Sequence, residues 1–401
     1  MAVTLPPSRT LPPLVEPTAE LSPAELARYA RHITLAEVGL DGQRRLASAR
    51  VLVIGAGGLG APTLLYLAAA GVGTIGVIDP DEVEESNLHR QVIHGQSDLG
   101  RRKVDSAADR MAEVNPYVTV EKHPYELTNE NAVELFGRYD LVLDGTDNFA
   151  TRYLVADAAE LADRPYVWGS ILRFQGQVSV FWASQGPTYR DLFPEPPAPG
   201  TVPSCAEGGV LGVLCSSIGS MMATEAVKLI TGIGEPLLGR VLVHDALAMT
   251  HQTLELRPDP ERVPVQALDD YAQLCGVATG TRTDQEESMA TDEIDPHQLQ
   301  EWLADREAGT HDFVLVDVRE PYEREINDIA GSVSIPMAKF ATGEALAELP
   351  ADTQIVLYCK AGARSGRCLE AVRAAGRGDA VHLGGGIDAW INEIEPDQAR
   401  Y

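Results

Sequence analysis

Residues 49–60, ARVLVIGAGGLG, join a short apolar, β-branched run directly to a glycine-rich loop. The run over 49–54 is typical of a buried strand, and residues 62–70 favour a helix. Glycines let backbone amides approach a ligand closely, and a helix N-terminus favours anions. The segment therefore predicts a strand–loop–helix unit that binds a nucleotide. The glycines expected to contact it are Gly55, Gly57, Gly58 and Gly60.

Strand and helix patterns alternate on the C-terminal side of this loop. Strands are expected over 74–79, 117–121 and 140–144, and helices over 102–114 and 129–136. This order predicts a Rossmann-like, doubly wound α/β sheet. Residues 175–182 alternate with period two, which indicates antiparallel strands and makes the sheet mixed. Residues 210–230 predict a long apolar helix.

Composition shifts predict the domain boundaries. Ser22-Pro23-Ala24-Glu25 has the pattern of an N-cap, a first-position proline and a first-turn acid, so a helix should begin there. The stretch after Cys275 is polar and poor in large apolar residues, as flexible linkers are. We expect a disordered tail over 1–22, a first domain over 23–275, a linker over 276–290 and a small α/β domain over 291–401.

Charge and cysteine content exclude several classes of protein. The formal net charge of -27 disfavours nucleic acid as a partner, because binding a phosphate backbone needs a basic surface. No apolar run reaches the length of about 18 residues that a membrane span needs, and the N-terminus lacks the pattern of a signal peptide. The five cysteines show no dense framework. A reducing, cytoplasmic location is expected.

The residues after the glycine loop bear on the type of nucleotide chemistry. Asp79 ends the next strand, where a carboxylate can bind ribose hydroxyls, and an NAD(P)-linked oxidoreductase fits that feature. Arg90 and Lys103 favour phosphoryl or nucleotidyl transfer instead, because charge develops on the phosphates in that transition state. The bland alternatives are a surface pair for Arg90 and a solvated helix position for Lys103.

Asp147 follows the strand over 140–144, at the edge where open α/β sheets bind ligands. Mg²⁺ prefers a carboxylate together with phosphate oxygens, so Asp147 is the predicted magnesium ligand. The alternative is a helix N-cap.

Together these motifs resemble the ubiquitin-activating superfamily, and specifically the bacterial adenylyltransferases MoeB and ThiF. The resemblance covers residues 24–257. It rests on RYARHI at 28–33, GAGGLG at 55–60, Asp79 with Asp81, NLHRQ at 87–91, Lys103 and TDN at 146–148.

The resemblance implies a homodimer that binds ATP and Mg²⁺. Arg31 would enter the partner subunit's site as an arginine finger, and its alternative is a pair on the helix surface. The further residues that it implies at the ATP site are Asp79, Asp81, Asn87, Arg90, Gln91, Lys103, Asp147 and Asn148. The implied reaction is attack by the C-terminal Gly-Gly carboxylate of a small ubiquitin-fold carrier on the α-phosphate. That step needs positioning and electrostatics rather than a protein nucleophile.

The adenylyltransferase family commonly carries a zinc ion between two Cys-x-x-Cys pairs. Thr188 and Asp191 stand at the first pair, and residues 257–265 contain no cysteine. Since tetrahedral zinc needs four such ligands, we expect no zinc site. Cys205 stands where relatives have a cysteine that captures the activated carrier, and the alternative is a helix-entry residue without a catalytic part. Cys215 lies in the apolar helix and is expected in the core.

A second reactive centre is predicted at Cys359, in CKAGARS at 359–365. An apolar strand precedes it and a helix over 366–375 follows, so loop amides, the helix dipole and Arg364 favour a thiolate or an anionic persulfide. A Cys-x5-Arg phosphatase would also bind an anion here, but this loop is one residue shorter. Cys368, on the following helix, is expected to pack.

The shorter loop and its flanks resemble the rhodanese sulfurtransferases over residues 291–398. The flanking motifs are LVDVRE at 315–320, IAGS at 329–332, IP at 335–336 and GGGIDAW at 384–390. The fusion resembles the MoeZ-type proteins of actinobacteria. It implies that thiosulfate or a cysteine desulfurase loads Cys359 with sulfur, which then reaches the carrier adenylate, with Cys205 as a disulfide partner for release.

The carrier's pathway stays open between molybdopterin (molybdenum cofactor), cysteine and tRNA-thiolation routes. Two other classes of function compete with this interpretation. One is the NAD(P)-linked oxidoreductase, and the other is a carrier-binding scaffold with decayed catalysis. The presence of Arg90, Lys103, Asp147 and Cys359 argues against the scaffold.

Overall fold

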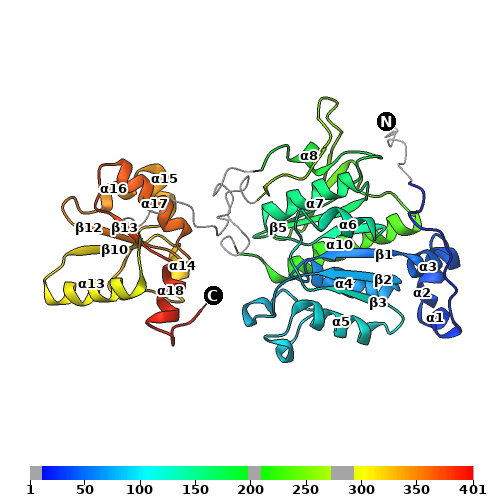
Figure 1. Cartoon of the computed structure of the whole chain (residues 1–401), viewed down its shortest axis with the longest axis horizontal. Coiled ribbons are helices and arrows are strands. Elements are labelled where there is room, and N and C mark those ends of the chain that lie inside the picture. The colour runs from blue at the N-terminus through cyan, green and yellow to red at the C-terminus, as the bar shows by residue number, and fades with distance from the viewer. Residues whose placement is uncertain (1–10, 197–208, 272–292, 401) are drawn as a thin grey trace. The chain divides into compact units, whose positions relative to one another are not determined.

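The structure is a computed structural model that describes residues 11–196, 209–271 and 293–400. The chain divides into two compact units, residues 1–279 and 280–401 (Figure 1). The predicted linker over 276–290 lies outside the described residues.

An eight-stranded mixed sheet forms the centre of the first unit, in the order β3-β2-β1-β4-β5-β6-β7-β8. Strands β1 to β5 run parallel, and β6, β7 and β8 extend the sheet in antiparallel fashion. The predicted mixed, doubly wound sheet is confirmed. The strands are β1 (Arg50–Ile54), β2 (Thr74–Ile78), β3 (Thr119–His123), β4 (Leu141–Asp144), β5 (Tyr166–Leu172), β6 (Gln175–Phe181), β7 (Arg240–Asp245) and β8 (Thr250–Glu255).

Helices cover both faces of this sheet (Figure 1). Alternate residues of β1 enter different cores: Val51 and Val53 join one cluster, and Leu52 and Ile54 join the other. A strand buried on both faces must be apolar throughout, which explains the unbroken run at 51–54. The helices are α1 (Pro23–Arg28), α2 (Ala30–Ile33), α3 (Gly39–Ser48), α4 (Gly60–Ala70), α5 (Lys103–Val114), α6 (Ala132–Gly137), α7 (Phe149–Leu161), α8 (Tyr189–Leu192) and α10 (Gly212–Thr231), with 3₁₀ turns at Glu85–Asn87 and Gln96–Asp98.

Helix α10 is long and apolar enough to cross a membrane, by length and composition alone. More than half of its most apolar window is buried inside the first unit, where α10 packs on α4, β5 and β6. Burial in the sheet's core explains its apolar composition, as expected for a core helix.

The N-terminal segment differs from the expected disordered tail over 1–22. Leu11, Leu14 and Val15 pack against the core, and the amide of Leu14 donates to the carbonyl of Leu229 in α10 at 3.1 Å. The tail prediction is therefore wrong for residues 11–22, while residues 1–10 lie outside the described part. Apolar side chains between the prolines anchor a segment whose composition alone indicates disorder.

Helix α1 begins as predicted. The Ser22 hydroxyl accepts from the Glu25 amide, the Glu25 carboxylate accepts from the Ser22 amide, and Pro23 occupies the first turn. This capping box satisfies two amides that the helix itself leaves unpaired.

The second unit has a five-stranded parallel sheet in the order β11-β10-β12-β13-β9. Central strand β12 leads into the loop that opens with Cys359. The strands are β9 (Glu293–Ile294), β10 (Phe313–Asp317), β11 (Val333–Ser334), β12 (Gln354–Tyr358) and β13 (Val381–Leu383). The helices are α13 (Pro296–Ala308), α14 (Pro321–Arg324), α15 (Met337–Thr342), α16 (Ala345–Glu348), α17 (Ala363–Ala374) and α18 (Gly386–Glu393).

Candidate functional sites

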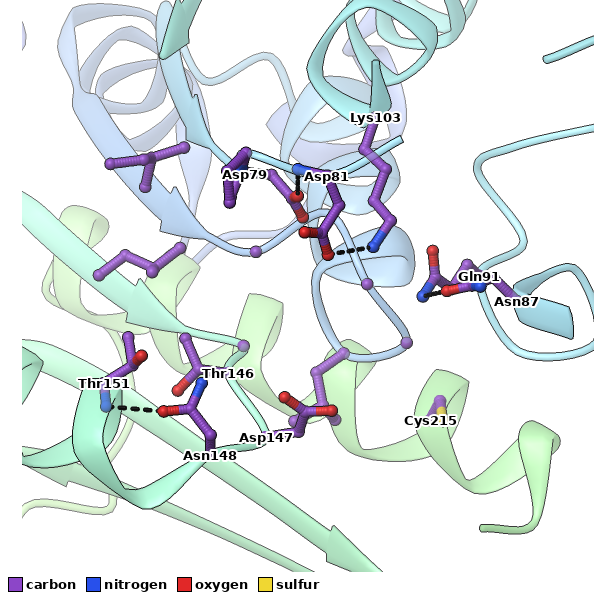
Figure 2. A pocket seen from close by; sticks show the side chains of 18 of the residues that line it. Asp79, Asp81, Asn87, Gln91, Lys103, Thr146, Asp147, Asn148, Thr151 and Cys215 are labelled. Carbon is purple, nitrogen blue, oxygen red and sulfur yellow. Dashed lines mark hydrogen bonds and ion pairs between the residues drawn. The ribbon is translucent and has the colours of Figure 1, made fainter. Parts of the chain in front are cut away.

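A cavity of about 380 Å³ lies where β1, β2 and β4 of the first unit end, and Figure 2 shows it. Ligands of open α/β sheets bind at such carboxyl edges. Gly60 is not among the residues that line it and instead begins α4. The predicted nucleotide-site residues that do line the cavity are Gly55, Gly57, Gly58, Asp79, Asp81, Asn87, Arg90, Gln91, Lys103, Asp147 and Asn148.

Three glycines of the loop are required for different reasons. Gly55 has a φ of +87°, in the region that favours glycine. A Cβ on Gly58 would lie 2.9 Å from the sulfur of Cys215, and one on Gly60 would lie 1.8 Å from the carbonyl oxygen of Gly55. The absence of a side chain at Gly60 therefore lets the two ends of the loop pack against each other. At Gly58 it leaves room for the Cys215 side chain.

Asp79 fixes the glycine loop through hydrogen bonds to its backbone. Its carboxylate accepts from the amides of Ala56 at 2.8 Å and Asp81 at 2.9 Å. Burial raises the pKa of Asp79, and the positive charge of Lys103 and the two amides oppose that rise. The loop is thus fixed before a ligand arrives, which lowers the entropic cost of binding.

Lys103 is the first residue of α5 and points into the cavity (Figure 2). Its ammonium pairs with the Asp81 carboxylate at 2.8 Å, and the side chains are 7% and 63% exposed respectively. Because Asp81 is mostly in solvent, Lys103 can exchange that carboxylate for a phosphate at small cost. Because Lys103 is buried, the structure favours a role in binding the ligand over the alternative of a solvated helix position.

Asn87 and Gln91 form the wall beside the 3₁₀ turn at 85–87 (Figure 2). Arg90 lines the same cavity. The Gln91 amide nitrogen donates to Asn87 Oδ1, while buried Gln91 Oε1 has no hydrogen-bond partner in the described part of the chain. A buried acceptor without a partner is costly, so it points to a ligand or water that donates there.

Arg90 is oriented by its neighbours, donating to the Ser86 carbonyl at 3.0 Å and lying 2.8 Å from His89 Nε2. Partial burial and the Arg90 charge lower the pKa of His89. A neutral His89 can accept from Arg90, so the guanidinium is held at the cavity rim.

Asp147 and Asn148 follow β4 on the opposite wall from Lys103 (Figure 2). Asn148, not Asp147, caps α7, accepting from the Thr151 amide at 2.8 Å. The helix-cap alternative for Asp147 therefore fails. Its carboxylate is exposed in the cavity and suits a cation that takes its remaining ligands from phosphates and water.

Several lining residues were not singled out as ligand contacts by the sequence. Cys215 was expected in the core and is indeed buried, yet it also lines the cavity from α10. Glu126 and Leu127 follow β3, on a stretch without a recognisable motif. The alternation of apolar residues in a strand identifies its buried side chains. It does not show which of the following loop residues will line a cavity at the sheet edge.

Two predicted residues stand apart from the cavity. Arg31 is exposed on α2 and does not line the cavity of its own chain. Cys205 lies outside the described residues.

Charged groups join α8 to residues 259–262, the two segments where the family resemblance implied cysteine pairs. Asp191 forms a capping box with Thr188 at α8, and its other oxygen accepts from the Asp259 amide at 2.8 Å. The same oxygen lies 3.5 Å from Arg262, whose guanidinium also pairs with Glu160 at 3.0 Å. Both carboxylates are almost fully buried, so this network joins the two segments directly.

Cys359 lies in a cradle at the start of α17. Its residue is 1% exposed, and its sulfur accepts from the Gly362 amide at 3.1 Å. The Ser365 hydroxyl lies 3.5 Å from the same sulfur. The Gly362 amide and the N-terminus of α17 therefore lie next to the sulfur, and such groups stabilise an anion.

Arg364, which was predicted to add positive potential at the sulfur, pairs with a carboxylate. Its guanidinium makes two hydrogen bonds of 2.7 Å to the buried carboxylate of Glu323 on α14. A buried carboxylate needs a positively charged hydrogen-bond donor, and the two N–H groups of the Arg364 guanidinium supply it. Arg364 is therefore a structural anchor of the loop, and its charge is largely balanced.

Cys368 packs in the core beneath α17, as expected. Burial raises the pKa of its thiol to about 12, and the nearby Cys359 adds to the rise. Cys368 therefore stays protonated and unreactive near neutral pH.

The fold and the cavity define an adenylyltransferase-like α/β unit, followed by a smaller unit with a buried cysteine in a strand–loop–helix turn. The model of the ThiF family matches residues 29–265, and that of the rhodanese-like domain matches residues 295–393. The chain belongs to the ThiF family and carries a rhodanese-like domain after it.

Full-length similarity supports the same arrangement. The chain is 56% identical over 398 residues to the probable adenylyltransferase/sulfurtransferase MoeZ of Mycobacterium tuberculosis, covering 98% of this chain and all of that protein. It is 51% identical over 265 residues to the sulfur carrier protein adenylyltransferase of Thermus thermophilus, covering 63% of this chain and 97% of that protein. The fold resembles Escherichia coli MccB in a crystal structure with ATP, with a TM-score of 0.52 and 18% identity over 59% of this chain and 74% of that one.

Proposed function

We propose that this enzyme adenylates the C-terminal glycine of a ubiquitin-fold sulfur carrier and then replaces the adenylate with sulfur carried by Cys359. The observation that carries the proposal is the pairing, on one chain, of an ATP-sized cavity lined by Arg90, Lys103 and Asp147 with a sulfur-anion cradle at Cys359. Its similarity to named adenylyltransferase/sulfurtransferases over nearly the full length supports both activities.

In the first step, a carboxylate oxygen of the carrier attacks the α-phosphorus of ATP, and the bond to the leaving pyrophosphate breaks. Negative charge grows on the phosphate oxygens, where Lys103 and Arg90 can balance it. Asp147 would hold Mg²⁺, which would screen the charge of the triphosphate when bound. The rigid glycine loop orients the nucleotide for in-line attack.

In the second step, the terminal sulfur of a Cys359 persulfide attacks the carrier's acyl carbon and AMP leaves. The product is an acyl disulfide between carrier and enzyme. A thiolate then attacks the sulfur of Cys359, the disulfide breaks, and the carrier departs as a thiocarboxylate. We propose Cys205 as that thiol, which leaves a Cys205–Cys359 disulfide for an external thiol to reduce.

The remaining features belong to the same proposal. The enzyme acts as a cytoplasmic homodimer, and Arg31, exposed on α2, serves the partner subunit's cavity. Thiosulfate or the persulfide of a cysteine desulfurase supplies the sulfur. The molybdenum cofactor, cysteine and tRNA-thiolation pathways each use a carrier of this chemistry.

The proposal is tested by separating the two activities. Cys359→Ala should keep carrier-dependent ATP–pyrophosphate exchange and lose thiocarboxylate formation. Lys103→Ala should lose both, because thiocarboxylate needs the adenylate. Loss of exchange in Cys359→Ala, with the fold intact by circular dichroism, would contradict the division of roles.

A further inference from the structure

A buried serine links the reactive sulfur to a histidine on a different strand. Ser365 Oγ lies 3.5 Å from Cys359 Sγ and 3.3 Å from His382 Nδ1. The same hydroxyl donates to the carbonyl of Gly362 at 2.9 Å. Ser365 is fully buried, so these groups compete for its one proton without water as an alternative.

The fold holds the histidine against the helix that carries the serine. On β13, Val381 and Leu383 face the core cluster that also contains Trp390, so His382 between them faces the opposite side of the sheet, towards α17. A Cβ added at Gly366 would lie 3.7 Å from the His382 ring. The small residue lets the helix approach the imidazole closely.

The protonation state of His382 decides where the Ser365 proton can go. A histidine with hydrogen on Nδ1 donates to Ser365 Oγ, and the serine proton then remains for the sulfur or for the Gly362 carbonyl. A neutral histidine with its hydrogen on Nε2 offers a lone pair at Nδ1 and competes for that proton. The sulfur anion gains an O–H donor in the first state and loses it in the second.

We propose that His382 is a positioning residue that sets, through Ser365, how readily the sulfur of Cys359 ionises. This inference rests on the proposed function, in which Cys359 holds the persulfide sulfur. The protonated imidazole donates to Ser365, Ser365 donates to the sulfur, and the thiolate or persulfide anion is stabilised. Loss of the Nδ1 proton withdraws the serine donor and makes the sulfur less acidic.

Other charged groups face the same space and contribute to the titration. Glu293 on β9 lies opposite His382 in the sheet register. On the other side of β13, Cys359 follows β12 directly. From α17, Arg364 and Arg367 carry charge, while Cys368 stays protonated because burial raises its pKa to about 12. Within the described residues, Ser365 Oγ contacts His382 and the sulfur of Cys359 but none of these charged side chains, so a change at His382 should be visible against them.

Alkylation of Cys359 in the full chain tests the proposal. The rate of iodoacetamide labelling is measured on the Cys359 peptide by mass spectrometry, from about pH 5 to about pH 9. The wild-type profile should contain two inflections, one from the sulfur and one from His382. Below about pH 6, where the imidazole is protonated, Ser365→Ala and His382→Phe should react about tenfold more slowly and lack the lower inflection. Ser365→Ala removes the hydroxyl donor, and in His382→Phe no N–H donates to that hydroxyl, whose proton stays on the Gly362 carbonyl.

His382→Asn serves as the conservative variant, since its amide offers an N–H near the position of Nδ1 that does not titrate. It should restore most of the rate without restoring the lower inflection. His297→Asn is the matched control, because the His297 side chain is 68% exposed on α13, and it should leave the profile unchanged.

A wild-type profile in His382→Phe, or equally slow reaction in His382→Asn and His382→Phe, would overturn the relay. Alkylation reports ionisation of the sulfur without any transfer to a carrier. Failure of the relay is therefore distinguishable from failure of the proposed sulfur transfer, which is measured in parallel as thiocarboxylate formation.

Discussion

Removal of the Asp191 carboxylate should destabilise the first unit, because two backbone amides lose their hydrogen-bond acceptor. The side chain is 2% exposed and accepts from the Thr188 amide at 2.6 Å and the Asp259 amide at 2.8 Å. Loss of a helix cap costs about 1 kcal/mol, and each hydrogen bond to a buried charge contributes about 1.5–3 kcal/mol. Arg262 keeps its bond to Glu160, so no unpaired charge remains. The Thr188 bond is the cap itself, so the cap and the single bond from Asp259 together predict a cost of about 3 kcal/mol for Asp191→Ala.

Differential scanning calorimetry of the full chain measures this change. For a unit of this size, about 3 kcal/mol corresponds to a fall of roughly 6–12 °C in the unfolding midpoint. Arg257→Ala is the matched control, because its pair with Glu255 lies on the same segment with side chains 83% and 70% exposed. An exposed pair contributes about 0–1 kcal/mol. Equal shifts in the two variants, or no shift in Asp191→Ala, would refute the reasoning.

Three further predictions concern the glycine loop, a buried thiol and a buried histidine. Gly60→Ala should abolish ATP binding by fluorescence titration, because its Cβ would lie 1.8 Å from the Gly55 carbonyl, whereas Gly57→Ala, with its nearest contact at 3.7 Å, should retain binding. Cys368, whose pKa is raised to about 12 by burial, should resist iodoacetamide at about pH 8 in peptide mass spectrometry, and substantial labelling in the folded chain would contradict this. Burial lowers the pKa of His94, so the folded state binds fewer protons than the unfolded chain and stability falls as pH drops below about 6.5. In urea unfolding, His94→Gln should make that fall shallower, and an unchanged slope would refute the assignment.

The parts of the fold that could be predicted follow from local rules. The run at 51–54 and the glycines after it indicate a buried parallel strand and a loop, because both requirements lie in adjacent residues. The period-two pattern over 175–182 correctly indicated the antiparallel extension. Ser22 and Glu25 form the predicted cap, since that contact spans a single helical turn.

The parts that could not be predicted depend on contacts between distant segments. Arg364 pairs with Glu323, which lies 41 positions earlier, so the sequence around Cys359 does not show that its charge is balanced. Residues 11–22 have the composition of a disordered segment, but Leu14 finds its partner on α10. Cys215 lines the cavity because α10 turns that face towards the loop, which an apolar pattern does not specify.

The measurement that bears most directly on the account follows a labelled sulfur from the enzyme to the carrier. The full chain is loaded at Cys359 with heavy-isotope persulfide, mixed with ATP and a ubiquitin-fold carrier ending in Gly-Gly, and the carrier's mass is recorded in a single turnover. The account predicts a carrier thiocarboxylate that contains the heavy sulfur and forms only when ATP is present. A thiocarboxylate without the label, or the same yield from Cys359→Ala, would contradict it.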